Sequence, residues 1–556
     1  MESINVYCVN TQQSYSVPLG STFNELATII LGEDSAMKPV AALLDNNLQS
    51  LRYRLFRDGM VEFVDGSTQD GYSVVVRSLI FLLYTAFREL YPTGSMNTEF
   101  YISNGVYCSF EADGYIDSEE QIAQICDKMR QIVAENCSIT RELTLTEKAC
   151  ELFVANGLHD KANLLIARGT LYSSVYKLKD SCDYYFGVLA HKTSALSVFD
   201  LKKYGEGVLL VLPDAKDPSR LAEPISQPKL LQTFEENRRW NKILGVTNIG
   251  DLNQSIAAGE GNALLNVCEA MQEKKISQIA DMIASRRDKV KVVLIAGPSS
   301  SGKTTFCKRL SIQLMLNGLH PIPLSMDDYF VEREFTPRDE NGKYDFENVD
   351  AVDIPYFTDS VKRILAGEEV EIPKFSFIEG RKIFEGRKVK FGKNSILIIE
   401  GIHGLNPKVT SLLDSETIFK VFISALTAIS IDEHNPINPT DNRLIRRMVR
   451  DHKYRGRSAQ ATLEGWEDVL AGEKKYIIPY QEEADVMFNT AMIYELAVLK
   501  SQAEPLLREV PETSPVHSKA LKLLKFLSYV KILEPISVPH VSLLREFLGG
   551  STFKYD

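Results

Sequence analysis

The chain has 556 residues, of which 44% are hydrophobic and 25% are charged, and its formal net charge is −11. Such a composition is ordinary for a soluble globular protein. The acidic balance argues against a protein that binds nucleic acid by bulk electrostatic attraction, although it is compatible with a local basic face. The length predicts about three or four domains.

Cysteines and apolar segments bear on the location of the protein. The eight cysteines are scattered, without the close pairs of a zinc knuckle, which is typical of a reducing compartment. The N-terminus has no basic region followed by an apolar segment, so no signal peptide is expected. The longest apolar run, Leu79 to Phe87, is too short to span a bilayer. We therefore expect a cytoplasmic protein without membrane contact.

Composition and periodicity divide the chain into five segments. The first has short strand-like stretches, the last of them at 72–76, and a short helix with Ser21 or Thr22 as its N-cap. The second opens with an apolar helix at 78–91. In chain order, the segments are a small β-rich domain at 1–75, an α+β domain at 76–225, a polar helical connector at 226–285, an α/β domain with a parallel sheet at 286–500, and a helical tail at 501–556.

A glycine-rich loop follows the first strand of the α/β segment. Residues 297–304 fit the phosphate-binding pattern G-x-x-x-x-G-K-[ST], with a β-branched strand before them and a helical pattern after them. Lys303 would reach the β- and γ-phosphates, and Thr304 would bind Mg²⁺. No base-reading N-K-x-D follows, so we expect ATP rather than GTP. The residues expected to bind ATP here are Gly297, Pro298, Ser299, Ser300, Ser301, Gly302, Lys303, Thr304 and Thr305.

Two later strands end in acidic residues. One strand ends before Asp327 and Asp328, and another ends at Glu400. In an open parallel sheet, such strand ends line the active-site crevice. Asp327 can accept the proton of an attacking hydroxyl, and Glu400 can bind Mg²⁺ through water. A turn or a helix cap is the structural alternative for the Asp-Asp pair.

An arginine-rich segment comes next. It carries arginines at 443, 446, 447, 450, 455 and 457. The first four share a helix, with Arg443, Arg447 and Arg450 on one face. Arginines on a mobile lid can close over phosphates and stabilise the transferring group. A solvated basic helix is the alternative.

In this order, the segments resemble the uridine kinase and phosphoribulokinase family of P-loop kinases. The resemblance covers about 290 to 490. Besides the phosphate loop, it rests on the Asp327 segment, Y-D-F-E-N-V-D-A-V-D at 344–353, P-K-F-S-F at 373–377, I-I-E-G-I-H-G-L at 398–405 and the arginine run at 443–457. It implies an ATP-dependent kinase whose acceptor is a small molecule, most readily a nucleoside.

The resemblance also implies roles for individual residues. Asp327 looks like the catalytic base, and Asp485 looks like the residue near the adenine. The other implied roles are catalysis for Lys303, Arg447 and Arg450, acceptor binding for Glu347, Phe375, Arg447 and Arg457, and lid closure for Arg443, Arg446 and Arg455.

Some positions depart from the family pattern. Phe375 and Gly380 replace the tyrosine and histidine that read the uracil base, and Gly465 replaces a glutamine of the lid. The residues of phosphoryl transfer are kept, whereas those of uracil recognition are not. Another nucleoside, or a sugar or polyol, therefore stays open as the acceptor.

The first two segments resemble domains of a different enzyme. Residues 16–27 resemble the TGS domain, a ubiquitin-like β-grasp module, and 76–225 resemble the second additional domain of threonyl-tRNA synthetase, an α+β editing domain. The editing-site positions of that family are here Ser78, Leu82, Tyr185 and Leu189. Leucine can neither bind a metal nor move a proton, so we expect neither editing chemistry nor zinc. The domain is then a scaffold for RNA binding, for regulation or for assembly into a homo-oligomer.

These segments leave three alternative hypotheses for the function. The first is an ATP-dependent small-molecule kinase, the second a tRNA- or ribosome-associated P-loop ATPase, and the third a structural protein with a vestigial loop. Asp327 argues against the second, because a switch ATPase needs no base for an acceptor hydroxyl. The retained Lys303 and Thr304 argue against the third.

Overall fold

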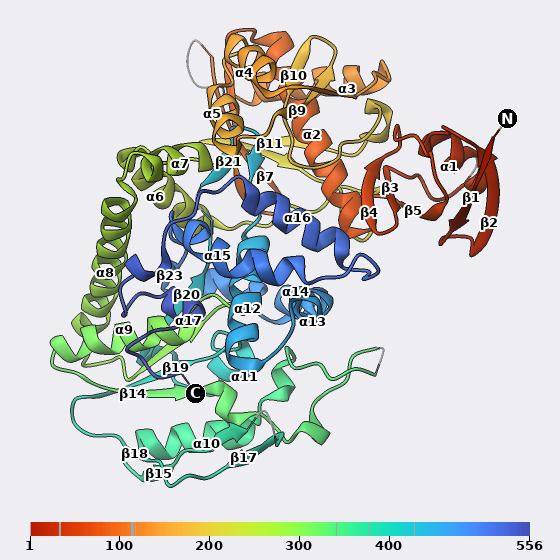
Figure 1. Ribbon diagram of the computed structural model, residues 1–556. Helices are drawn as coiled ribbons and strands as arrows, with labels where there is room; N and C mark the ends of the chain where they lie inside the picture. Colours follow the sequence, from red (N-terminus) through yellow and green to blue (C-terminus); the bar gives the residue numbers. More distant parts are fainter. Residues whose placement is uncertain are drawn as a thin grey trace.

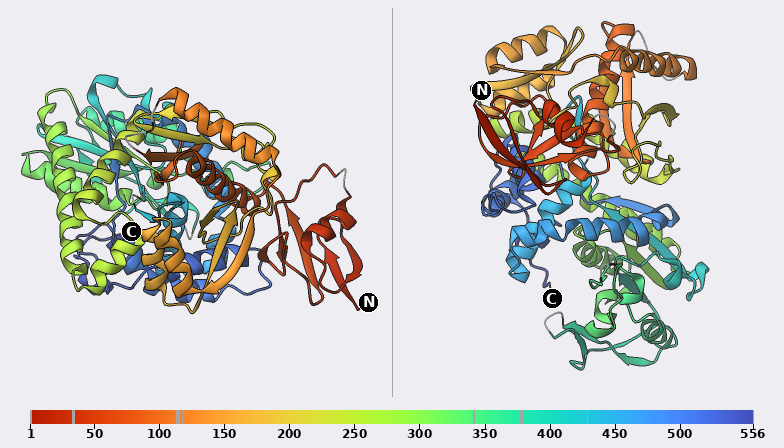
Figure 2. Two further views of the ribbon diagram at one scale, coloured as in Figure 1. Left: turned by 90° about the horizontal axis from the view of Figure 1, so that it is seen from above. Right: turned by 90° about the vertical axis from the view of Figure 1, so that its right-hand side faces the viewer.

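The parts of the chain are arranged around a parallel sheet in its C-terminal half. The computed structural model describes residues 2–32, 35–112, 116, 118–340, 342–376, 379–427 and 429–555. Figure 1 shows the second domain above the parallel sheet, the connector helices beside it, and the N-terminal sheet projecting at one side. The view from above in Figure 2 shows the same projection of the N-terminal sheet.

The N-terminal part is a five-stranded sheet with one helix, α1 (Phe23–Leu31). Thr22 caps this helix: its hydroxyl accepts the Glu25 N–H at 3.2 Å, and the Glu25 carboxylate accepts the Thr22 N–H at 2.7 Å. Phe23 and Leu26 then face the core of the sheet. In spatial order the strands are β2 (Gln13–Pro18), β1 (Ser3–Cys8), β5 (Gly59–Val64), β3 (Ala41–Leu44) and β4 (Asn47–Ser50).

The segment at 72–76 is helical, and the prediction of a strand there is wrong. It belongs to α2 (Gln69–Leu90), which begins after Thr68, whose hydroxyl accepts the Gly71 N–H at 3.1 Å. This helix is buried on all sides from Val74 to Phe87, so its β-branched residues serve packing. The expected domain boundary between 75 and 76 falls inside α2.

The second domain packs helices against two antiparallel sheets, with the strand orders β11-β12-β7-β6 and β10-β9-β8. Ser78, Leu82, Tyr185 and Leu189 all lie in its buried core, where the Ser78 hydroxyl accepts the Ala190 N–H at 2.8 Å. The elements are β6 (Ser95–Ile102), β7 (Gly105–Glu111), α3 (Glu119–Ala134), β8 (Thr140–Leu145), α4 (Thr146–Ala155), α5 (His159–Arg168), β9 (Tyr172–Leu178), β10 (Ser181–Asp183), β11 (Asp200–Tyr204) and β12 (Gly207–Val211).

The connector is part of the packing of the α/β domain. It consists of α6 (Pro228–Leu244), α7 (Ile249–Ala257) and α8 (Gly261–Ser285). The long helix α8 lies along α9 (Lys303–Leu316), with Arg309 paired to Glu273 at 2.6 Å, while α6 packs on the edge strand β23 (Val486–Asn489). The connector helices therefore pack on the α/β domain rather than merely joining two domains.

The α/β domain is built on five strands in the order β14-β19-β13-β20-β23. All neighbouring pairs run parallel, which confirms the predicted parallel sheet. The strands are β13 (Val292–Ala296), β14 (His320–Ser325), β19 (Ser395–Glu400), β20 (Ile418–Ser424) and β23. The surrounding elements are α10 (Ile354–Leu365), the hairpin strands β16 (Lys374–Ser376) and β17 (Arg381–Ile383), α12 (Pro439–Arg455), α13 (Ala459–Glu464) and α14 (Trp466–Tyr476).

The tail returns to the α/β domain. Its helices are α15 (Glu495–Arg508), which spans the expected boundary at 500, α16 (His517–Ser528) and α17 (Arg545–Leu548). Helix α16 packs on α15 and β4, and α17 packs on α12. As a result, the largest cluster of buried hydrophobic side chains includes residues from the second domain, the connector, the α/β domain and the tail.

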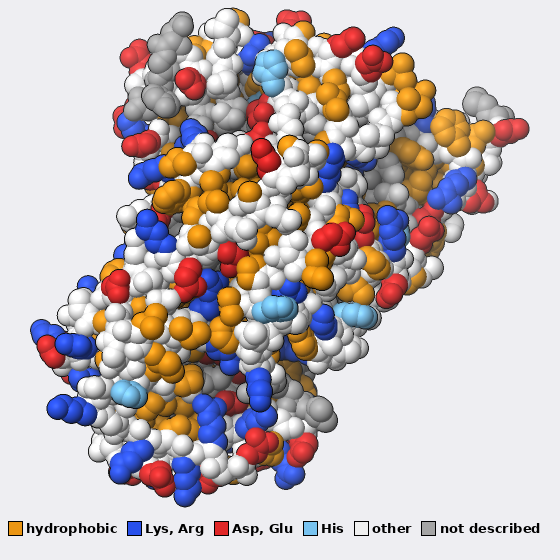
Figure 3. Space-filling view, turned by 60° about the vertical axis from the view of Figure 1, so that its left-hand side comes forward, with side chains coloured by type: hydrophobic (Ala, Val, Ile, Leu, Met, Phe, Trp, Pro, Cys, Tyr) orange, Lys and Arg blue, Asp and Glu red, His pale blue; other side chains and the backbone are white. Residues whose placement is uncertain are grey.

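The surface combines charges of both signs. On the face drawn in Figure 3, Lys and Arg side chains are interspersed with Asp and Glu, with hydrophobic side chains between them. Within the ranges given above, no helix combines the length and the apolar character needed to cross a membrane.

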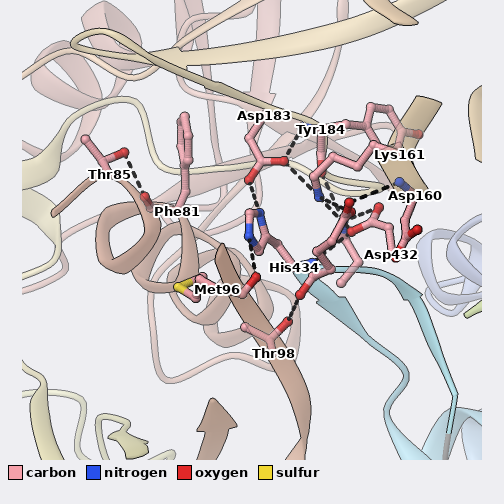
Figure 4. Close-up of polar contacts among 12 residues, drawn as sticks. Phe81, Thr85, Met96, Thr98, Asp160, Lys161, Asp183, Tyr184, Asp432 and His434 are labelled. Carbon is pink, nitrogen blue, oxygen red and sulfur yellow. Dashed lines mark hydrogen bonds and ion pairs between the residues drawn. The ribbon is translucent and has the colours of Figure 1, made fainter. Parts of the chain in front are cut away.

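A buried group of charges joins the second domain to the α/β domain (Figure 4). Lys161 of α5 donates to Asp183 at 2.9 Å and to Asp432 of β21 (Ser430–Asp432) at 2.7 Å, and His434 Nδ1 lies 2.7 Å from Asp183. All four side chains are fully buried. Burial alone would raise the pKa of Asp183, but the charges of Lys161 and His434 outweigh it and lower the pKa to about 2. Paired charges therefore fix the position of one domain on the other.

Replacing Lys161 by Met should destabilise the protein strongly. The change removes the buried cation that Asp183 and Asp432 share and leaves only His434 beside Asp183, for which we expect a loss of about 3–5 kcal/mol in the free energy of unfolding. Urea unfolding followed by tryptophan fluorescence measures it. The matched control is Lys177→Met, because Lys177 is half-exposed in its pair with Glu142, and such pairs contribute about 0–1 kcal/mol. Equal effects of the two substitutions would contradict the role of the buried group.

Candidate active site

Three neighbouring strands end together at one edge of the parallel sheet. Glu400, the last residue of β19, pairs with Ile295 of β13 on one side and with Ser325 of β14 on the other. The glycine-rich loop follows β13, and Asp327 follows β14 in a 3₁₀ turn at Met326–Tyr329. The register of the sheet therefore brings the loop, Asp327 and Glu400 to the same edge.

The loop between β13 and α9 has the tight backbone that a phosphate cradle needs. Gly302 has a φ of 87°, and a Cβ on Gly297 would lie 2.0 Å from the carbonyl oxygen of Ile423, so only glycine fits at 297. Lys303 Nζ donates to the carbonyl oxygen of Gly297 at 2.9 Å. The ammonium group and the backbone N–H groups at the start of α9 are the groups that phosphate oxygens attract.

Thr304 and Glu400 lie side by side at the end of the loop. Thr304 Oγ1 is 3.5 Å from Glu400 Oε1, and the Ser325 hydroxyl donates to the same carboxylate oxygen at 3.1 Å. Burial, followed by the charge of Asp327, raises the pKa of Glu400 to about 7. Hydroxyl and carboxylate oxygens are ligands that Mg²⁺ prefers, so these two residues fit that ion. In the described part of the chain, no cluster of three or more His, Cys, Asp and Glu could hold a metal by itself.

Asp327 faces a positively charged crevice. Its side chain reaches solvent, but the surrounding protein displaces enough water to raise the pKa of the carboxyl group. The charges of Lys303, Arg455 and Arg450 act in the opposite direction. A carboxylate in such surroundings can serve as a general base. The structure thus brings together Asp327 and Lys303, as the sequence predicts.

Glu347 belongs to the same group of charges. A Cβ on Gly472 would lie 2.3 Å from the Glu347 Cβ, so α14 packs closely against this residue. Burial, followed by the charge of Glu473, raises the pKa of Glu347 to about 7, against the opposing charges of Arg447 and Lys303. Its Oε2 is buried and has no hydrogen-bond partner among the described residues. This oxygen can therefore accept a hydrogen bond from a ligand.

Two arginines of α12 connect the helix to the loop and to Asp327. Arg447 donates from Nη1 to the hydroxyl of Ser299 at 2.7 Å. Arg450 donates from Nη2 to Asp451 at 2.9 Å, and its charge acts on Asp327. Both side chains are largely buried, so the orientation of their guanidinium groups is fixed.

Arg455 and Arg457 lie at the end of α12 and just beyond it. The Arg455 side chain is 54% exposed, and its charge acts on Asp327. Arg457 donates from Nη2 to the carbonyl oxygen of Ala461 at 2.6 Å, and its charge acts on Arg447. Both charges act on residues of the crevice, and Arg455 is the more exposed of the two.

Glu473 is a site residue that the sequence did not indicate. Its carboxylate accepts the Ser299 N–H at 3.0 Å and forms two bonds with Arg443, at 2.6 and 2.7 Å. Buried Arg443 therefore stabilises the loop through Glu473. No sequence signal marks Glu473, because it lies on α14, far along the chain from the loop that it contacts.

Arg446 does not belong to a lid, which corrects the prediction. It is fully buried, with Nε donating to Glu495 at 3.2 Å and Nη1 donating to Thr490 at 3.1 Å. Consecutive helical residues point about 100° apart, so Arg446 and Arg447 face different neighbours. Arg446 supports the loop from behind, because Thr490 donates in turn to the carbonyl oxygen of Ser301 at 2.6 Å.

Asp485 is not brought to the loop, which corrects the place expected for it near the adenine. Its carboxylate accepts the Lys420 N–H at 2.8 Å, and its own N–H donates to the Lys420 carbonyl oxygen at 2.8 Å. Asp485 precedes β23, whereas the loop follows the carboxyl end of β13. It therefore fixes the register of the edge strand.

Of the three positions that depart from the family pattern, Phe375 and Gly380 lie on the β16–β17 hairpin, whereas Gly465 lies between α13 and α14. Phe375 packs against Phe330, with 5.6 Å between the ring centroids. Gly380 has a φ of 69°, and a Cβ there would lie 2.8 Å from the Cβ of Arg333. Arg333 thus fills the space that a side chain at 380 would take. Phe377, the last residue of the P-K-F-S-F motif, lies outside the described residues.

His403 is a second residue that the sequence analysis did not select. Its buried ring packs edge-on against Tyr476 at 6.3 Å, shortly after Glu400. Burial lowers the pKa of His403 to about 4, and the charge of Lys303 acts in the same direction. The imidazole is therefore neutral at neutral pH, with one donor and one acceptor. The sequence could have indicated His403, because it follows the end of β19 by three residues and such strand ends line the crevice.

The tail reaches the first turn of α9. Glu546 accepts the Thr305 hydroxyl at 2.7 Å and the Thr305 N–H at 3.3 Å, and Tyr555 Oη lies 3.0 Å from that hydroxyl. A Cβ on Gly302 would lie 2.5 Å from Leu543. Helix N-termini attract anions. A carboxylate of the chain itself thus occupies the N–H and the hydroxyl that a phosphate group would use here.

Comparison with known proteins places this geometry in a family. Residues 292–496 match the model of the family described as Phosphoribulokinase / Uridine kinase. The match begins at β13 and ends at α15, so it includes the loop, Asp327, Glu400 and α12. It identifies a P-loop kinase domain of this family in the C-terminal half of the chain. The parts before it and most of the tail lie outside the match.

Three relatives illustrate how far the similarity extends. A uridine kinase of Schizosaccharomyces pombe is 35% identical over 179 residues, which are 32% of this chain and 35% of that protein. A uridine kinase of Ligilactobacillus salivarius is 27% identical over 207 residues, or 37% of this chain and 87% of that protein. The uridine-cytidine kinase A of Dictyostelium discoideum is 29% identical over 198 residues, or 35% of each chain. The first and third are therefore matched over about a third of their own length.

Replacing Glu546 by Gln should strengthen ATP binding. The change removes the negative charge beside Thr305, and a hydrogen bond to a charged group contributes about 1.5–3 kcal/mol. We expect a fall of roughly tenfold in the Kd for ATP, measured by isothermal titration calorimetry, because competition by the carboxylate is weakened. The matched control is Glu534→Gln, an exposed residue of the same tail. Unchanged or weaker ATP binding by the Glu546 variant would contradict this role of the tail.

Proposed function

We propose that this chain is an ATP-dependent kinase that transfers the γ-phosphoryl group of ATP to a hydroxyl of a small molecule, with nucleosides as the acceptor class. The observation that carries the proposal is the position of Asp327. Its carboxyl group lies at the carboxyl edge of the sheet, in the field of Lys303, Arg450 and Arg455. A base beside a phosphate loop is what transfer to a hydroxyl requires.

The residues of the site account for the steps of the reaction. Asp327 accepts the proton of the acceptor hydroxyl, and the freed oxygen forms a bond to the γ-phosphorus. The bond from that phosphorus to the oxygen bridging the β-phosphate breaks, and ADP leaves. Lys303 and the arginines of α12 offset the negative charge of the transferring group. When bound at Thr304 and Glu400, Mg²⁺ supplies further positive charge beside the phosphates.

The acceptor lies, in this proposal, on the α14 side of the crevice. Glu347 has a buried oxygen there that lacks a hydrogen-bond partner among the described residues, and Arg447 is held against the loop. Phe375 and Arg457 are the further acceptor contacts of this proposal. A carboxylate of this kind suits the hydroxyl groups of a sugar. The relatives named above are uridine and uridine-cytidine kinases, which supports a nucleoside. Since Phe375 and Gly380 differ from the uracil-reading residues, a sugar or polyol remains the second acceptor class.

We also propose that the N-terminal sheet with α1, and the second domain that begins with α2, are TGS-like and threonyl-tRNA synthetase-like domains without chemistry of their own. Support comes from the five-stranded sheet with its single helix and from the buried side chains at Ser78, Leu82, Tyr185 and Leu189. RNA contact, a homo-oligomer and a cytoplasmic location stay predictions. A tRNA-dependent ATPase is the alternative that such domains suggest.

Coupled ATP turnover with Mg²⁺ should identify the acceptor. The panel comprises uridine, cytidine, other nucleosides, ribose derivatives, inositols and tRNA, with Asp327→Asn as the control. We expect one small-molecule class to stimulate turnover, and the Asn variant to lose roughly 10²–10⁴-fold in kcat, because it cannot accept the proton. Stimulation by tRNA alone, or full activity of the Asn variant, would refute the kinase proposal.

Activity should fall as the solution becomes acidic. The pKa values of Glu347 and Glu400 are raised to about 7, and that of Asp327 is raised as well. Each carboxyl group therefore gains a proton as the pH falls through its raised pKa, and a protonated Asp327 cannot act as a base. Because Glu347 and Glu400 also become protonated as the pH falls below about 7, a profile of kcat/KM against pH should decline there. A profile that stays flat down to about pH 5 would argue against carboxylate catalysis.

A further inference from the structure

A cavity outside the candidate active site lies where three parts of the chain meet. Its volume is about 250 Å³. Its walls come from β4 of the N-terminal sheet, from α2, β8 and β9 of the second domain, and from α16 of the tail. Helix α16 contacts both β4 and α15, and Figure 1 shows it running from the middle of the molecule toward the N-terminal sheet.

The charges in the cavity wall are mostly positive. The wall contains one carboxylate, Asp70, and four cations, which are Arg77, Arg141, Lys522 and Lys525. Of these four, one has an ion pair within the described residues: Lys522, which is 2.7 Å from Asp441. A chain with a net charge of −11 has many carboxylates available, yet three of these cations lack one.

Arg77 is a buried cation that has no close ion pair among the described residues, although the charges of Asp70 and Asp441 act on it from farther away. It is 8% exposed, and its Nε and Nη2 donate to the carbonyl oxygen of Val188 at 3.2 and 3.1 Å. A guanidinium group has further N–H donors that these two bonds leave available. Burying a charge without a counter-charge is unfavourable. An anion in the cavity would therefore stabilise the arrangement.

Arg141 and Lys525 approach the cavity from opposite elements, β8 and α16. Arg141 donates from Nε to the hydroxyl of Ser174 at 2.9 Å. Burial, followed by the charges of Arg141, Arg168 and Arg77, lowers the pKa of Lys525 to about 7. Burial is the larger cause and the converging cations add to it, and a bound anion would oppose the shift.

The volume of the cavity and its aromatic side chains indicate a ligand larger than a free inorganic ion. The aromatic residues of the wall are Tyr176, Tyr185 and Phe186. The Arg77 guanidinium lies 5.6 Å from the centre of the Phe186 ring. A cavity of about 250 Å³ has room for more than a single phosphate ion. Aromatic side chains suit the organic part of a larger ligand.

We propose that this cavity binds the phosphate monoester of a small metabolite, with its phosphate among Arg77, Arg141 and Lys525 and its organic part against the aromatic wall. Guanidinium and ammonium groups from separate elements recognise phosphate by charge-assisted hydrogen bonds. Nucleotides and sugar phosphates share this chemistry, and the experiment below separates them.

The place of the cavity connects it to the candidate active site. Lys522 of α16 pairs with Asp441 in the first turn of α12, the helix that carries Arg447. A ligand that holds α16 against α2 therefore acts on the helix that orients the active-site arginines. An effect on activity rests on the proposed function, whereas binding does not.

Calorimetry on the full chain tests the binding. The probes are uridine 5′-monophosphate, ribose 5-phosphate, inorganic phosphate and tRNA. We expect at least one of the two esters to bind at least tenfold more tightly than inorganic phosphate. Lys525→Met and Arg141→Gln should each weaken that ester at least tenfold, since each removes one charge-assisted contact. Lys519→Met is the matched control, because Lys519 lies on α16 but pairs with Glu467 outside the cavity.

A further variant excludes the phosphate loop as the source of binding. Lys303→Met should leave ester binding unchanged, because that residue lies in the candidate active site. Arg141 is exposed, so its variant should keep the fold even if that of Lys525 does not. No saturable ester binding, loss of binding in the Lys303 variant, or full binding in the Lys525 and Arg141 variants overturns the proposal. So does equal affinity for inorganic phosphate, or binding of tRNA alone.

Discussion

The register of the parallel sheet is the constraint on which the candidate active site depends. Because Glu400 pairs with both Ile295 and Ser325, three strands end at one level. The phosphate loop, the Asp327 turn and the Glu400 carboxylate follow directly from those ends. A shift of one strand by a single residue would turn every second side chain to the other face of the sheet and would separate these groups.

Elements outside the family match complete the kinase domain. The connector helix α8 lies along α9, and α17 of the tail places Glu546 on Thr305. On the other side, the buried charges around Lys161 attach the second domain. The hydrophobic core is continuous across all these parts, so the α/β domain is not packed independently of them. Events at the tail or at the second domain can therefore reach the loop through packed elements.

The candidate active site and the cavity beside α16 differ in the balance of their charges. The crevice holds carboxyl groups whose pKa values are raised to about 7, at Glu347 and Glu400, beside the cations of α12 and Lys303. This arrangement suits a site that must bind phosphates and also remove a proton. The wall of the cavity beside α16 holds four cations and one carboxylate, and three of those cations have no ion pair within the described residues. One site is therefore suited to chemistry, and the other only to holding an anion.

The sequence alone determined the features that short chain segments can encode. The loop at 297–304, the acids that end two strands, and the parallel sheet follow from local spacing and period, and the structure has all three. Helical spacing put Arg446 and Arg447 on different faces of α12, but it could not show that the face of Arg446 is buried against Glu495 and Thr490. The sequence also could not place Asp485 or indicate that 72–76 is helical. It gave no sign of Glu473 and Glu546 at the loop, because these positions depend on contacts between distant segments. Local pattern fixes backbone geometry, whereas burial and charge pairing are decided only when those segments pack together.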